Sequence, residues 1–166
     1  MTIPLFKMAE NGAIFSYDRS YRYCLWREWY VDHPAIAFIG LNPSTADEKD
    51  NDATIRKCIG YAKSWGFGKL YMVNLFGYCS RNPINLDYAK DPVGPDNDWW
   101  LVVTATKVKR MVACWGSHEG VSERAAIVKE LLKGKVKIEA FGFTKTGHPL
   151  HPLYLKKTCE PMEMCL

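Results

Sequence analysis

Four short apolar segments, separated by stretches with helical patterning, constrain the fold of this chain more than any other feature. Each segment has five or six residues, a usual strand length, and is predominantly apolar. Strands that are apolar on both sides belong in a parallel sheet with both faces covered. The sequence therefore predicts an α/β fold whose strands comprise residues 35–39, 70–75, 111–115 and 136–141.

Helices with capping residues are predicted between these strands, over residues 52–65, 96 to about 109, and 122–133. Asp52 and Asp96 are suitable N-caps, and Gly134 is a suitable C-terminal stop. Because crossovers between parallel strands are right-handed, successive strands point the same way. We therefore expect a three-layer α/β/α arrangement with a central four-stranded parallel sheet.

The chain is predicted to form a single domain over residues 1–166, since it contains no internal repeat, low-complexity tract or linker. Residues 13–17 and 21–26 indicate a β-hairpin, which lies within an N-terminal extension of residues 1–30. Residues 158–166 are expected to form a tail.

Composition and net charge limit the classes of partner that the protein can have. Of the 166 residues, 48% are hydrophobic and 24% are charged, as in ordinary globular domains. No apolar run approaches the ~20 residues of a membrane span, and residues 1–11 lack the pattern of a secretory leader. We expect a cytoplasmic protein without a membrane partner. The net charge of +4 permits nucleic acid or a nucleotide as partner without requiring one; the oligomeric state is not indicated.

The cysteines favour reduced structural thiols over a metal or iron–sulfur site, because none of the six forms a C-x-x-C pair. The sequence also lacks a P-loop, a G-x-G-x-x-G motif and a nucleophile elbow. We therefore predict no metal and no cofactor. The six cysteines are Cys24, Cys58, Cys79, Cys114, Cys159 and Cys165.

Ligands of open α/β sheets bind beyond the carboxyl ends of the strands, so the segments that follow the predicted strands form the candidate site. After the first strand, a glycine permits close backbone approach and an Asn-Pro pair forces a turn. Asn42 and the backbone donors near Ser44 can therefore face a ligand. The alternative is a turn in which Asn42 bonds only to backbone. This first loop contains Gly40, Leu41, Asn42, Pro43, Ser44 and Thr45.

Polar and aromatic residues also follow the second and third strands. Asn74 stands in an otherwise apolar strand, where its amide is costly unless it is hydrogen-bonded. That amide suits the edge of a nucleobase, and the alternative is a buried Asn bonded to backbone. The third strand ends at Trp115, and His118 follows as a site residue or a solvated loop histidine.

Two His-Pro dipeptides follow the fourth strand, at His148 and His151. Either imidazole can polarise a carbonyl oxygen or stabilise a developing negative charge. Two histidines are too few for a zinc site, and a third ligand is not evident. An acidic run after the first loop is interpreted as a solvated face and a helix cap at Glu48 and Asp52. Asp47 and Asp50 remain candidates for a general base or a cation contact.

Four motifs, taken in order, resemble a bacterial and phage family known only as a domain of unknown function. The resemblance spans roughly residues 21–155 and implies no activity. The motifs are IGLNPSTAD at 39–47, VNLF at 73–76, GPDND at 94–98 and GHPLHPLY at 147–154.

The same loops are similar, in type and order, to those of the uracil-DNA glycosylase superfamily. This resemblance implies that Asn42 positions the hydrolytic water and that Asn74 reads the base edge. Phe76 or Tyr78 would stack on the base, and one of the two His-Pro histidines would stabilise the departing base. Two features differ from that superfamily. The His-Pro loop at residues 147–154 lacks the Ser-Pro-rich continuation that wedges into DNA, and Asn42 is a weaker base than the Asp of the most active members.

The leading hypothesis is a hydrolase that cleaves the N-glycosidic bond of a nucleobase, in DNA or in a free nucleotide. A second is a transferase or lyase that modifies a base and holds a co-substrate beside Asp47, Asp50 and Arg56. A third is a non-catalytic module that binds nucleic acid or a nucleotide. The base, and the choice between polymer and monomer, are left open by the sequence.

Overall fold

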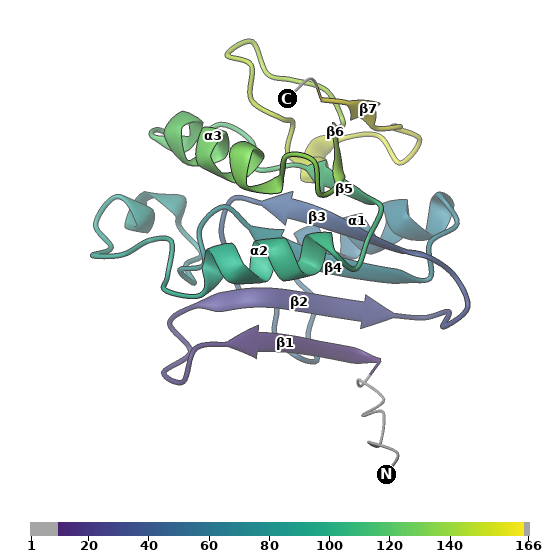
Figure 1. Cartoon of the computed structure of the whole chain (residues 1–166), viewed down its shortest axis with the longest axis horizontal. Helices are drawn as coiled ribbons and strands as arrows, with labels where there is room; N and C mark the ends of the chain where they lie inside the picture. Colours follow the sequence, from purple (N-terminus) through teal and green to yellow (C-terminus); the bar gives the residue numbers. More distant parts are fainter. Residues whose placement is uncertain (1–9, 165–166) are drawn as a thin grey trace.

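The computed structural model describes residues 10–164, so the expectations for residues 1–9 and Cys165 lie outside the described part. Over this part of the chain the fold is mixed α/β, with three α-helices and one seven-stranded sheet in the order β1-β2-β4-β3-β5-β6-β7 (Figure 1). Among these residues, no helix combines the length and apolarity of a membrane span. The strands are β1 (Asn11–Phe15), β2 (Arg22–Glu28), β3 (Ala35–Gly40), β4 (Lys69–Asn74), β5 (Arg110–Ala113), β6 (Lys137–Ala140) and β7 (Met162–Glu163).

The sheet is larger than the four strands that the sequence predicts as a central parallel unit. β3 pairs in parallel with β4 and with β5, and β5 pairs in parallel with β6. The predicted hairpin does not stand apart, because β2 pairs antiparallel with β4 and extends the same sheet. At the other edge, β7 pairs antiparallel with β6 inside the expected tail. An exposed two-residue strand carries no periodicity that a sequence could reveal.

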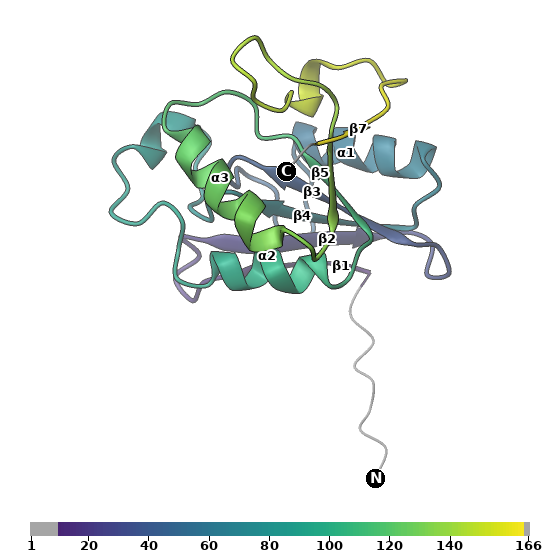
Figure 2. The same cartoon turned by 45° about the horizontal axis from the view of Figure 1, so that its top comes forward.

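The helices cover both faces of the sheet (Figure 2). On one face, α1 (Ala53–Ser64) buries Ile55, Cys58, Tyr61 and Ala62 in a cluster with Phe38 and Leu70. On the other face, α2 (Asn97–Ala105) and α3 (Val121–Leu132) bury residues in a second cluster with the opposite side chains of β3, β4 and β5. Alternate residues of the central strands therefore enter different cores, which explains why these strands are apolar throughout.

Helix ends agree with the sequence in part. The Asp52 carboxylate caps α1 by accepting a hydrogen bond from Ile55 N at 2.8 Å, as expected. Asp96 precedes α2 without a side-chain cap bond. α2 ends at Ala105 rather than near Lys109, because the chain turns at Thr106 to enter β5. Two short 3-10 helices, η1 (Pro83–Leu86) and η2 (Pro152–Tyr154), lie in the loops after β4 and β6.

The end of β4 is tied to α2 and α3 by buried polar side chains. Asn97 Nδ2 donates to the carbonyl oxygens of Asn74 and Leu75, at 3.0 and 3.1 Å. Arg124 Nε donates to the same Leu75 carbonyl at 2.8 Å, and its Nη2 pairs with Asp98. These bonds satisfy backbone groups where the strand ends. They fix the backbone of Asn74 at the edge where the carboxyl ends of the parallel strands meet.

Candidate functional site

A cavity of about 380 Å³ lies at the carboxyl ends of β3, β4 and β5, next to the start of α1. This volume is within the ~300–1,000 Å³ range of small-molecule sites. Residues from three of the predicted loops and from the His-Pro loop line it together. The lining includes the predicted site residues Gly40, Leu41, Asn42, Ser44, Asn74, Trp115 and His151.

Asn42 joins two of the loops. Its Nδ2 donates to the carbonyl oxygens of Pro43, Tyr78 and Ser80, at 3.0, 3.3 and 2.9 Å. The amide nitrogen therefore connects the loop after β3 to the loop after β4. No donor reaches Asn42 Oδ1 from residues 10–164, so this oxygen is the part of the side chain that a ligand or water can use.

Asn74 is buried at the end of β4 with an unsatisfied amide. Its side chain is 3% exposed, and Nδ2 has no hydrogen-bond partner in the described part of the chain. Gly40 leaves the space for it, because a Cβ on Gly40 would lie 2.6 Å from Asn74 Oδ1. A buried amide without a partner is destabilising. Because Asn74 also lines the cavity, its Nδ2 donor is left for a ligand or a water molecule.

Trp115 and His151 add two further groups to the wall. The indole Nε1–H of Trp115 is buried and has no partner among the described residues. His151 precedes η2, and its Nδ1 accepts a hydrogen bond from Leu153 N at 3.2 Å. Burial lowers the pKa of His151, and the nearby Asp52 carboxylate opposes this only in part. The neutral ring therefore carries its proton on Nε2 and can donate it to a ligand.

Lowering the pH should destabilise the protein through His151. The folded ring has a pKa below its usual 6.5, so below that pH the unfolded chain binds a proton that the folded chain does not. Stability therefore falls as the pH falls through this range, whereas above it both states are neutral. Urea unfolding at pH 7.5 and 5.5 should show a smaller decline for His151→Gln than for the wild type. An equal decline in both proteins would contradict this assignment.

The remaining predicted site residues lie outside the cavity. Pro43 is buried and Thr45 is exposed at the edge of the first loop. Phe76 packs in the core, and Tyr78 makes an edge contact with Tyr21. Phe76 and Tyr78 therefore do not form the expected aromatic wall of the cavity, and the aromatic residue that lines it is Trp115.

The two other predicted histidines have different surroundings. His118 Nε2 lies 3.2 Å from a carboxylate oxygen of Asp87, near the surface. The backbone N–H of His148 donates to Thr144 Oγ1 at 3.1 Å, and its side chain does not line the cavity. Of the two His-Pro histidines, His151 is the one that the structure brings to Asn42 and Asn74.

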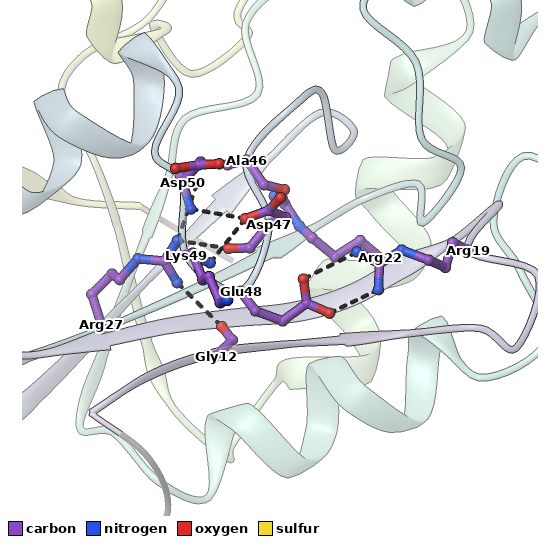
Figure 3. A network of polar contacts seen from close by, with 9 residues as sticks. All are labelled: Gly12, Arg19, Arg22, Arg27, Ala46, Asp47, Glu48, Lys49 and Asp50. Atoms are coloured by element: carbon purple, nitrogen blue, oxygen red, sulfur yellow. Dashed lines mark hydrogen bonds and ion pairs between the residues drawn. The ribbon is translucent and has the colours of Figure 1, made fainter.

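Asp47 organises a loop instead of facing the cavity (Figure 3). Its Oδ1 accepts hydrogen bonds from the N–H groups of Lys49 and Asp50, both at 2.8 Å, and these bonds lower its pKa. Glu48 pairs with Arg19 through both carboxylate oxygens. The acidic run is therefore a closed, hydrogen-bonded turn beside the site.

The sequence interpretation missed several lining residues. Arg22 comes from β2, a strand predicted only as part of a hairpin, and its side chain is buried. Asp52 was assigned only to capping, yet it is the one carboxylate residue on the cavity wall among the described residues. The only sequence signal for the burial of Arg22 is that aromatic and apolar residues follow it, and this signal is weak. Four further lining residues that it missed carry hydroxyl or basic groups: Thr54, Ser80, Arg81 and Ser117.

The described cysteines and acidic groups form no other site. Cys24, Cys58, Cys79, Cys114 and Cys159 are free thiols, and burial raises the pKa of Cys24 to about 11. Between residues 10 and 164, no three His, Cys, Asp or Glu side chains gather in a way that would hold a metal ion.

Comparison with known proteins places the chain in a family without assigning an activity. No curated protein and no solved structure matches it. One family model, described as "Protein of unknown function (DUF1643)", matches residues 22–153. This range contains every residue named above as part of the cavity wall. The chain therefore belongs to the DUF1643 family.

Proposed function

We propose that this protein hydrolyses the N-glycosidic bond of a nucleotide. The observation that carries the proposal is that four residues at or after the ends of four different strands line one cavity: Asn42, Asn74, Trp115 and His151. The uracil-DNA glycosylase-like loops support it, as do the parallel pairings β4-β3-β5-β6 with helices on both faces. A three-layer glycosylase-like architecture and a cytoplasmic location are parts of the same proposal.

The lining residues can divide the chemistry between them. Water attacks C1′ of the sugar and gives a proton to the Asp52 carboxylate, while the C1′–N bond breaks and its electron pair leaves with the base. The released base then takes up a proton, which balances the reaction. Asn42 Oδ1 and the Asp52 carboxylate are acceptors that can orient this water and stabilise a cationic sugar. The Nε2–H of His151 can stabilise the negative charge that develops on the base. Asn74 supplies an amide to the base edge, where its unsatisfied Nδ2 finds an acceptor.

The Asp52→Asn variant separates the proposed catalytic role of the Asp52 carboxylate from its structural role as the N-cap of α1. Asn caps helices about as well as Asp, so we expect a change in the free energy of unfolding of only a few tenths of a kcal/mol. Base release should fall by ~10²-fold or more, because a general base is lost. Chemical denaturation and a rate assay on the same sample provide the two values. An unchanged rate would remove Asp52 from the mechanism.

The function is tested on polymeric and free substrates together. Oligonucleotides with uracil, hydroxymethyluracil or mismatches are incubated with the protein and treated with alkali, which breaks the strand at abasic sites. Deoxynucleoside monophosphates are incubated in parallel and analysed for free base. Release that is lost in Asn42→Ala supports the hydrolase. Ligand binding without release from any substrate would replace it with a non-catalytic binding module.

A further inference from the structure

Arg22 is a buried cation that has no carboxylate within ion-pair distance in the described part of the chain. Its side chain lines the cavity, and the residue is 2% exposed. Nη1 donates to the Ala46 carbonyl at 2.6 Å, and Nε is buried without a partner. No other hydrogen bond or ion pair involves its guanidinium within residues 10–164. Burying a charge without pairing it is strongly unfavourable.

Arg27, on the same strand, is a buried arginine whose guanidinium is fully hydrogen-bonded, and it serves as a comparison for Arg22 (Figure 3). Its three guanidinium nitrogens donate to Asn51 Oδ1 and to four backbone carbonyls, at 2.6 to 3.3 Å. Arg27 does not line the cavity. Both arginines hold the turn that follows Thr45, but only Arg22 keeps unused donors next to an open volume.

The charge of Arg22 persists although burial lowers its pKa, because the guanidinium has a very high intrinsic pKa. Asp52 lies on the same wall, yet its Oδ1 caps α1 and neither oxygen is within ion-pair distance of Arg22. Arg81 adds a second positive charge at an exposed part of the lining. The cavity therefore has an excess of cationic groups.

Other polar groups on the same cavity wall suit a phosphate. Ser44 and Thr54 contribute hydroxyls, and Thr54 belongs to the first turn of α1. Backbone N–H groups at a helix N-terminus favour anions. A guanidinium fork with hydroxyl donors is a common arrangement for binding phosphate oxygens.

We propose that Arg22 binds the terminal phosphate of a nucleoside monophosphate, which makes a free nucleotide the substrate rather than a base in duplex DNA. The nucleoside part of this assignment rests on the proposed function, whereas the anion site rests on Arg22. A terminal phosphate can enter a cavity to reach a buried guanidinium, whereas a phosphodiester is held at both ends by its chain. The modest charge of +4 agrees with a small ligand.

Calorimetric titration of the whole chain tests the site. The probes are the 5′-monophosphates of deoxyuridine and the four common deoxynucleosides, each compared with its nucleoside, and inorganic phosphate as competitor. At least one monophosphate should bind ~10-fold or more tightly than its nucleoside, and phosphate should compete with it. Arg22→Gln should abolish that difference, and Arg22→Lys should restore part of it.

Arg27→Lys is the matched control, since it removes hydrogen bonds of a buried arginine on the same strand without touching the cavity. Each variant is first checked for cooperative unfolding, and binding is measured on folded protein. Equal affinities for monophosphates and nucleosides, no binding of any monophosphate, or retained binding in Arg22→Gln would overturn the proposal. The calorimetric assay measures binding alone. If a nucleotide binds through Arg22 but the separate assay detects no base release, the proposed hydrolase activity is refuted and the anion site is not.

Discussion

We expect His151→Ala to lower the rate of base release by ~10²–10³-fold, the usual effect of removing one preorganised donor from a developing charge. The ring is held by the Leu153 N–H on Nδ1, and its lowered pKa keeps it neutral. It therefore acts as an N–H donor that costs no reorganisation during the reaction. Steady-state rates at pH 7.5, with the nucleotide saturating, measure the effect.

His148→Ala is the matched control for His151→Ala. Both histidines precede a proline in the same loop, and only His151 lines the cavity. We expect His148→Ala to retain the wild-type rate. A large loss in His148→Ala with little loss in His151→Ala would show that the choice of His151 from the cavity lining must be reversed.

Gly40→Ala should lower the activity strongly while the protein still folds. The new Cβ would lie 2.6 Å from Asn74 Oδ1, so the Asn74 amide has to move. Overpacking of this kind costs about 1–3 kcal/mol of stability. If Asn74 binds the base edge as proposed, its displacement should reduce kcat/KM by ~10²-fold or more, because misplacing a positioning group is sufficient for such a loss.

Gly60→Ala is the matched glycine substitution. Gly60 lies within α1, and a Cβ there meets no atom within 4 Å. Alanine in a helix interior should raise stability by ~0.5–1 kcal/mol, and activity should be unchanged. Thermal unfolding and base release are measured on both variants. Full activity in Gly40→Ala would show that the position of Asn74 does not matter for the reaction.

The sequence predicted the parts of the fold that depend on local pattern. The apolar runs became β3 to β6, and Asp52 caps α1 as expected, because burial and capping leave direct marks on residue type. The extent of the sheet depends instead on which strands pair over long distances. The pairing of β2 with β4, for example Leu25 with Met72, has no local signature.

The candidate site was predictable to the same extent. Asn42, Asn74 and Trp115 lie at or just after the ends of parallel strands, and the rule that these strand ends share an edge brings them together. Arg22 reaches the cavity only because the hairpin joins the sheet, so its role depends on tertiary pairing. The choice between His148 and His151 depends on the path of one loop. Spacing alone could not settle it, because both precede proline.

The most direct test of the central claim is to detect free base by chromatography and mass spectrometry. Wild-type protein and His151→Ala are incubated at equal concentration with each deoxynucleoside monophosphate. We predict that the wild type releases a base from at least one nucleotide and leaves the deoxyribose phosphate, ~10²-fold or more faster than the variant. Equal release by both proteins, or no release from any nucleotide or oligonucleotide, would contradict it.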